Sequence, residues 1–155
     1  MKGDFLKMTQ SGRDPVTLLQ ESGLRATPQR VAVLNSMDAM GQVHPTAEEL
    51  YTVLKGAFPT ISFATVYNTL RSLIDAGLAV ELQYGDRASR FDLNTALHHH
   101  LICEKCGSMT DVYLPQLQVG DAGLEHDFQV TRYHVEIRGL CKYCREENRA
   151  GQGPN

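Results

Sequence analysis

Residue types that bind metals are concentrated in HHHLICEKCG, residues 98–107, where three histidines and two cysteines fall within ten residues. A second cysteine pair in CKYC, Cys141 and Cys144, repeats the spacing of Cys103 and Cys106. Two C-x-x-C knuckles deliver four thiolates in a tetrahedron, the arrangement that Zn²⁺ prefers in structural sites. Such a site is coordinatively closed and holds structure without catalysing a reaction. We therefore predict a structural zinc site at the four cysteines.

The cysteines have two other possible uses, as a thioredoxin-like redox pair or as two disulfides. A redox C-x-x-C usually lies at the N-terminus of a helix in a βαβ unit, whereas we expect each pair here at the end of a strand that is followed by a turn. Structural disulfides are rare in the cytosol, where we expect this chain. The zinc site is the preferred interpretation.

The histidine run before the first knuckle has a different donor chemistry. If it is a strand, its side chains alternate, so that His98 and His100 share one face and His99 lies on the other. Two imidazoles so placed can chelate one ion, and a solvated polar run is the alternative. Three further potential ligands lie elsewhere in the chain: His44, Asp92 and Asp111. Sequence spacing does not show whether these groups meet.

Helix signals fill the first half of the chain. The segment PVTLLQESG (15–23) predicts a short helix that ends at Gly23, and Thr27 before Pro28 predicts the start of the next. HPTAEELYTVL (44–54) contains a capping box, in which Thr46 is followed three residues later by Glu49. A helix over 63–76 is expected between Ser62 as N-cap and Gly77 as the residue after its end. Its Val66, Leu70, Leu73 and Ile74 share one face at helical spacing.

Strand signals begin after this helix. The stretch AVELQYGDRASRFDL (79–93) alternates and breaks at Gly85-Asp86, which predicts a hairpin. Three helices followed by a hairpin indicate a winged helix-turn-helix. The rest reads as strands, with one short helical connection around 115–125. We predict an α+β chain made of a flexible arm (1–14), a winged-helix DNA-binding domain (15–93), a hinge (94–97), an α/β dimerisation and metal-binding domain (98–148) and a disordered tail (149–155).

Composition sets outer limits on function. The chain has 155 residues and a net charge of −3, so DNA binding requires a local surface and not an overall basic charge. No apolar run approaches the ~20 residues needed to span a bilayer. The start MKGDFLKMTQ has no apolar segment of the kind found in secretory signals, which predicts a cytoplasmic protein.

These motifs together resemble the ferric uptake regulator family of metal-dependent repressors over about residues 15–148. The markers are TPQR (27–30), HPTAEELY (44–51), SFATVYNTL (62–70), RFD (90–92), HHHLICEKCG (98–107) and CKYC (141–144). The resemblance implies a winged-helix domain joined by a hinge to an α/β dimerisation domain, with a structural zinc on the four cysteines. It also implies a regulatory divalent ion that bridges the two domains, held by His44, Asp92, His98, His100 and Asp111. Nitrogen and oxygen donors of this kind suit Fe²⁺ or Mn²⁺.

The two aspartates indicate a branch of the family. Iron-uptake members typically carry glutamates where Asp92 and Asp111 stand, and zinc sensors carry a cysteine at the first position. The Asp/Asp pair is similar to the peroxide-sensing branch, in which bound Fe²⁺ reacts with hydrogen peroxide and a ligand histidine is oxidised. The matching histidines are His44 and His98. A further metal site found in some members is not expected, because one of its positions is Leu97, which cannot ligate; the others are His99, Gln118 and Tyr133.

The helix over 63–76 matches the recognition helix of the family. Its outward residues Thr65, Tyr67, Asn68 and Arg71 are our candidates for contact with bases, since a helix fits the major groove. Arginines around it are expected to contact phosphates, namely Arg25, Arg30, Arg87 and Arg90. A plain amphipathic helix with a polar outer face is the alternative.

The resulting hypothesis is a homodimeric, metal-dependent repressor that binds double-stranded operator DNA and senses hydrogen peroxide. Its requirements are one structural Zn²⁺ and one Fe²⁺ or Mn²⁺ per chain, no membrane, and no small-molecule substrate other than peroxide as a signal. The first alternative is an iron- or manganese-responsive repressor of metal uptake without peroxide sensing. Remoter alternatives are a zinc hydrolase that uses His98 and His100, for which no H-E-x-x-H motif is present, and a zinc-ribbon interaction module.

Overall fold

The computed structural model describes residues 12–83, 87–115, 127–129, 133 and 135–150. The chain divides into two compact units, unit 1 (residues 1–95) and unit 2 (residues 96–155). The division lies inside the segment 94–97, for which a hinge was predicted. Most of the predicted arm lies outside the described residues.

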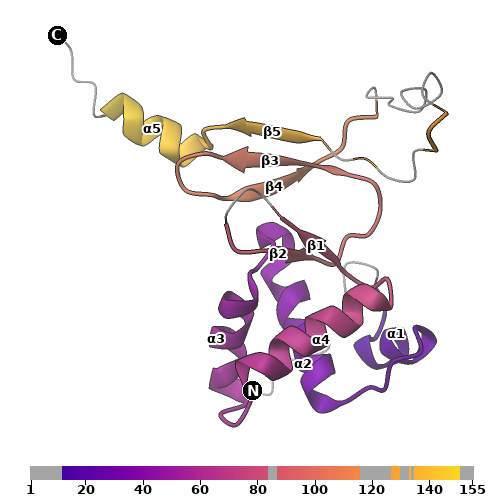
Figure 1. Ribbon diagram of the computed structural model, residues 1–155. Helices are drawn as coiled ribbons and strands as arrows, with labels where there is room; N and C mark the ends of the chain where they lie inside the picture. The colour runs from indigo at the N-terminus through magenta and orange to yellow at the C-terminus, as the bar shows by residue number, and fades with distance from the viewer. Residues whose placement is uncertain (1–11, 84–86, 116–126, 130–132, 134, 151–155) are drawn as a thin grey trace. The chain divides into compact units, whose positions relative to one another are not determined.

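Unit 1 begins with helices that start where the sequence placed them (Figure 1). They are α1 (Pro15–Glu21), α2 (Pro28–Met40), the 3₁₀ turn η1 (Gly41–Val43), α3 (Ala47–Ala57) and α4 (Phe63–Asp75). The side chains of Thr27, Thr46 and Ser62 each accept a hydrogen bond from the backbone N–H three residues on, which satisfies a donor that the helix start leaves open. The capping box of Thr46 and Glu49 is complete.

The predicted hairpin follows α4. Strands β1 (Val80–Leu82) and β2 (Arg90–Asp92) are antiparallel, with Val80 opposite Asp92. The turn predicted at Gly85-Asp86 lies outside the described residues. Helix α2 packs against α1, α3 and α4, and α3 packs against α4, so the helices and hairpin form a winged helix-turn-helix.

One apolar core holds unit 1 together. From α4 it receives Val66, Leu70 and Leu73, all fully buried as the helical spacing predicted, while Ile74 packs against its border. Strand β2 adds Phe91, which is 1 % exposed. Burial of an aromatic ring of this size anchors the hairpin to the helices, and it fixes the strand that carries Asp92.

The described residues of unit 2 contain a three-stranded sheet followed by a helix (Figure 1). Strand β3 (His99–Cys103) lies in the middle, antiparallel to β4 (Met109–Val112) and parallel to β5 (Glu136–Gly139). Helix α5 (Lys142–Ala150) follows β5 directly. The described part of the chain contains no helix that is long and apolar enough to cross a membrane.

Helix α5 corrects two expectations. Strand character was predicted up to the second cysteine pair, followed by a turn, yet Cys144 lies in the first turn of a helix. The predicted tail over 149–155 begins too early, because the helix continues to Ala150. The polar sequence KYCREENRA has no apolar stripe at helical spacing, so periodicity gave no signal for it. The helical connection expected around 115–125 lies almost wholly outside the described residues.

Candidate metal centres and nucleic-acid interface

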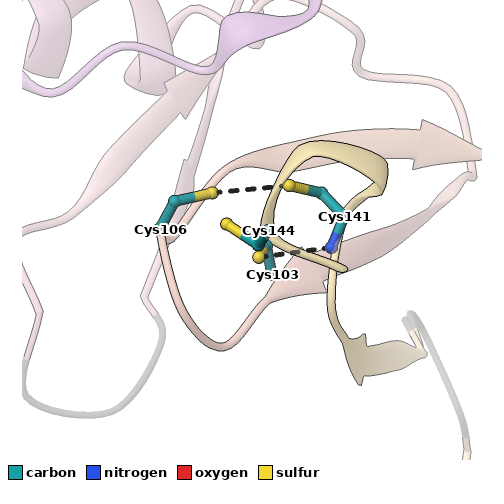
Figure 2. A group of neighbouring side chains, drawn as sticks. All are labelled: Cys103, Cys106, Cys141 and Cys144. Atoms are coloured by element: carbon teal, nitrogen blue, oxygen red, sulfur yellow. Dashed lines mark hydrogen bonds between the residues drawn. The ribbon is translucent and has the colours of Figure 1, made fainter. Parts of the chain in front are cut away.

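The four cysteines form one cluster at one end of the unit 2 sheet (Figure 2). Cys103 ends β3 and Cys106 lies in the turn after it, whereas Cys141 directly precedes α5 and Cys144 lies in its first turn. Their sulfur atoms all lie within 4.8 Å of one another, and the cysteines are free thiols. Four thiolates at this separation fit a structural zinc site. The second pair does begin a helix, as a redox pair would, but the gathering of both pairs favours one four-sulfur site.

Local hydrogen bonds prepare two of the thiols to be thiolates, the form that binds zinc. The backbone N–H of Cys141 donates to Sγ of Cys103 over 3.3 Å. Backbone donors at Cys106 and Cys141 lower the pKa of Cys103 to about 6. Ser108, whose Oγ lies 3.2 Å from Sγ of Cys106, lowers the pKa of that thiol by hydrogen bonding. Burial raises the pKa of Cys144 to about 12, which opposes an uncompensated thiolate there.

Unit 2 also brings His98, His100 and Asp111 together. The Nε2 atoms of His98 and His100 lie 2.9 Å apart. Oδ1 of Asp111 lies 3.6 Å from Nε2 of His98 and 3.7 Å from Nε2 of His100. Strand register explains the third member, because His100 is paired with Asp111 across β3 and β4. The prediction that His98 and His100 share a face is confirmed.

The tautomer of His98 fits a ligand. Its Nδ1 lies 2.8 Å from the carbonyl oxygen of Ala96, which only accepts hydrogen bonds, so Nδ1 carries the proton. The lone pair is then on Nε2, which faces His100. Metal-binding histidines commonly donate their second N–H to a carbonyl in this way.

His99 has a separate role on the other side of β3. Its Nδ1 accepts a hydrogen bond from the backbone N–H of Val135 over 3.1 Å, and its ring lies 5.9 Å from that of Tyr133. These contacts link β3 to the segment before β5. Two other positions of the further metal site that was not expected are Leu97, which is 56 % exposed, and Gln118, which lies outside the described residues.

Unit 1 holds the two remaining candidate ligands side by side. Nε2 of His44 lies 3.5 Å from Oδ2 of Asp92, and both side chains are buried. Asp92 comes from β2, and its Oδ1 accepts the backbone N–H of Asn94 over 2.8 Å. His44 lies between η1 and α3 in a left-handed backbone conformation, with φ 49° and ψ 73°. An imidazole and a carboxylate at this distance are a suitable half of a site for a divalent cation.

The outer face of α4 has the composition of a DNA-reading surface. Tyr67 and Asn68 are exposed, and Thr65 is half-buried with its Oγ1 2.8 Å from Oγ of Ser62. The ring of Phe63 stacks on that of Tyr67 at 6.4 Å between centroids. An exposed aromatic pair on a helix that fits the major groove can contact thymine methyl groups.

Three of the arginines predicted to contact DNA differ in their contacts within the protein. Arg71 is exposed, with Nη1 3.5 Å from a carboxylate oxygen of Glu81 on β1. Arg30 donates to the carbonyl of Arg25 over 3.0 Å. Arg90, for which a phosphate contact was predicted, donates to the carbonyl of His44 over 2.8 Å. Sequence reasoning missed this contact because it joins residues 46 positions apart.

The model of the ferric uptake regulator family matches residues 21–138. The chain belongs to the ferric uptake regulator family. Its members are transcriptional regulators and not enzymes, so the hydrolase alternative is wrong for this chain.

Individual relatives of the family are similar over nearly the whole chain. The peroxide-responsive repressor PerR of Staphylococcus epidermidis is 46% identical over 149 residues, which are 95% of this chain and 99% of that protein. PerR of Staphylococcus aureus strain COL is 45% identical over 136 residues, 86% of this chain and 91% of that one. The Vibrio cholerae ferric uptake regulator matches in fold with a TM-score of 0.70 at 28% identity, covering 83% of this chain and 100% of that chain. The Campylobacter jejuni peroxide stress regulator matches at 0.60 and 31% identity, covering 85% and 100%.

Proposed function

We propose that this protein is a metal-dependent transcriptional repressor that responds to hydrogen peroxide. The observation that carries the proposal is the combination of a winged helix with two ligand clusters in a chain so similar to peroxide-responsive repressors. Two aspartates, not glutamates, complete the nitrogen and oxygen donor set. A cytoplasmic location follows from a repressor's need to reach operator DNA.

The regulatory ion is proposed to be Fe²⁺ or Mn²⁺, held by ligands from both units. Unit 1 contributes His44 and Asp92, and unit 2 contributes His98, His100 and Asp111. Support comes from each unit separately, since its own ligand atoms already converge within 3.7 Å of a neighbour. Residues 94–97 act as the hinge between them. Because ligands come from both sides of this hinge, ion binding favours one orientation of the DNA-binding domain, which is what a ligand-driven switch requires.

DNA recognition is assigned to α4. Thr65, Tyr67, Asn68 and Arg71 contact base edges in the major groove, and Arg30 contacts phosphate. Two copies of the chain bind a two-fold-related operator, since a dimer places two recognition helices one helical turn apart or a multiple of it. Neutralisation of the two aspartates by the ion also reduces repulsion between phosphate and a chain of net charge −3.

Dimerisation is assigned to unit 2. A hollow of about 330 Å³ is lined by Leu101 on β3, Ile137 on β5 and Leu140 after β5, which are 42 %, 39 % and 42 % exposed. Exposed apolar side chains that gather on one sheet face mark a protein interaction site. A second copy of the chain is the proposed occupant.

Peroxide sensing is assigned to His44 and His98. Bound Fe²⁺ supplies the redox chemistry that activates peroxide beside a ligand ring. In the overall change a ring C–H becomes C–OH, and the second oxygen of the peroxide leaves as water. The oxidised ring is a poorer ligand, so the hinge is released and the operator is freed.

The test combines DNA binding with peptide masses. Gel shifts on a palindromic, A/T-rich operator are expected to require Mn²⁺ or Fe²⁺, and failure with every divalent ion would end the repressor proposal. The Fe²⁺ form is then treated with dilute peroxide, and its peptides are weighed. One added oxygen on His44 or His98, together with lost DNA binding, is expected. Metal-dependent binding that persists without an added oxygen would leave the plain iron- or manganese-responsive repressor.

A further inference from the structure

We propose that Arg90 is a positioning residue for the metal ligands of unit 1. It ties the backbone of His44 to strand β2 and so sets the distance between His44 and Asp92. The inference rests on the proposed function, because it assigns a residue to the regulatory site proposed there.

The backbone of His44 needs such a tie. Its φ of 49° places it in the left-handed region, which only about a few per cent of residues other than glycine adopt. A conformation of this kind persists only where the surrounding structure fixes it. Pro45 follows and has no N–H to donate, so the segment cannot be held by a backbone hydrogen bond from that residue.

Strand β2 supplies the missing restraints. Nη1 of Arg90 donates to the carbonyl of His44 over 2.8 Å, and the backbone N–H of Phe91 donates to the carbonyl of Pro45 over 2.9 Å. Thr46 and Arg90 also form an isolated antiparallel bridge. The residues 44–46 therefore lie along β2 as a short additional edge of the hairpin.

The guanidinium joins this edge to the start of α3 as well. Glu49 accepts the backbone N–H of Thr46 over 2.8 Å, and the same carboxylate oxygen lies 3.5 Å from Nη1 of Arg90. Arg90 thus contacts both ends of the segment 44–46: the carbonyl of His44 at its start and the carboxylate of Glu49, which caps Thr46 at its end. The side chain of Arg90 is 23 % exposed, which limits its availability for DNA.

Asp92 is placed by the same strand. Residues i and i+2 of a strand point to the same face, so Asp92 follows Arg90 on the side that meets the His44 segment. The hydrogen bond from Arg90 acts together with the pairing of residues 45 and 46 to β2, and it is the one that holds the backbone of His44 itself. In this arrangement Nε2 of His44 and Oδ2 of Asp92 lie 3.5 Å apart.

The charge of Arg90 and its positioning role predict opposite effects of its removal on cation affinity, so the direction of the change tests the proposal. A guanidinium close to a cation site repels the cation, so removal of Arg90 strengthens cation binding if charge alone matters. If Arg90 positions the ligands, its removal weakens binding. Changes to the outer partners of metal ligands typically cost about 10- to 100-fold in metal affinity, and we expect a loss of about tenfold or more.

The experiment measures Mn²⁺ affinity of the full-length, zinc-loaded protein without DNA, from the electron paramagnetic resonance signal of free Mn²⁺. Arg90→Ala is expected to bind Mn²⁺ about tenfold or more weakly, and Arg90→Lys, which keeps a donor and the charge, to recover part of the loss. Arg87→Ala, which removes an exposed charge from the same hairpin, is the matched control and should bind as the wild type does. The structural zinc content should be unchanged in all three.

Unchanged or tighter Mn²⁺ binding by Arg90→Ala would overturn the proposal. If that variant fails to fold, as shown by loss of amide protection in α4, Arg90→Met carries the test, because it keeps an unbranched side chain without a donor. Wild-type affinity in Arg90→Met together with normal protection of the Phe91 amide would overturn the proposal. His44→Ala separates the two levels of inference. An unaltered affinity in His44→Ala refutes the proposed metal site itself, whereas a weakened His44→Ala beside an unaltered Arg90→Ala refutes only the role of Arg90.

Discussion

Removing the second cysteine knuckle should unfold unit 2 and leave unit 1 folded. The perturbation is the double substitution Cys141→Ser and Cys144→Ser. Apart from cysteines, the buried apolar side chains among the described residues of unit 2 are Ile102 and Met109. The large apolar core lies wholly in unit 1.

The free-energy contributions to folding indicate why unit 2 should depend on zinc. Full burial of two apolar side chains stabilises a fold by about 3–6 kcal/mol. Ordering a residue costs about 1.5 kcal/mol, so the nine residues of α5 alone cost more than that burial returns. An isolated helix of this length is also marginal in water. Structural zinc sites contribute about 10–16 kcal/mol, which is the largest single stabilisation available to this unit.

The assay is zinc content together with amide hydrogen exchange resolved by peptide. The double variant should hold no zinc, and peptides over β3 and β4 should lose protection while those over α2 and α4 keep theirs. Tyr143→Ser is the matched control, because Tyr143 lies between the two cysteines and is 78 % exposed. Its effect should stay within about 0.5 kcal/mol. Normal protection of β3 in a zinc-free double variant would refute the reasoning.

Four smaller perturbations test other parts of the fold and the DNA-reading face. Phe91→Ala should lower the free energy of unfolding of unit 1 by about 3–5 kcal/mol in urea titrations. Val53→Ala on α3, whose side chain is 53 % exposed, should lower it by about 0.5 kcal/mol or less. Equal effects would contradict the assigned core. Thr46→Ala breaks the capping box and should cost about 1 kcal/mol by thermal unfolding, so an unchanged melting temperature would argue against it. Tyr67→Ala should weaken operator binding by about 1–3 kcal/mol, the cost of one mismatched base pair, with nonspecific binding little changed. Replacing thymine by uracil in the operator should matter less to Phe63→Ala than to the wild type, and an undiminished effect would exclude Phe63 from methyl contact.

Local signals made the helical half of the fold predictable. The N-caps Thr27, Thr46 and Ser62 act within one turn, so their sequence context is sufficient to place three helix starts. The apolar face of α4 was predictable for the same reason. Helix α5 was missed because its residues are almost all polar and its position depends on the cysteine cluster.

The metal centres were predictable only as far as local geometry reaches. Strand alternation placed His98 and His100 together, but the pairing of Asp111 with His100 depends on the register of β4, which the sequence between them does not determine. The contact of Arg90 with the carbonyl of His44 depends on tertiary packing between the hairpin and the start of α3. The charge of Arg90 predicted a phosphate contact, but no local pattern in the sequence predicted this one.

The central claim is that one ion joins His44 and Asp92 of unit 1 to His98, His100 and Asp111 of unit 2. A double-mutant cycle on Mn²⁺ affinity tests it most directly, with His44→Ala in unit 1, His98→Ala in unit 2 and both together. Ligands of a shared ion are coupled, so the double variant should lose clearly less affinity than the sum of the two single losses. Strictly additive losses, or a wild-type affinity in either single variant, would contradict the claim.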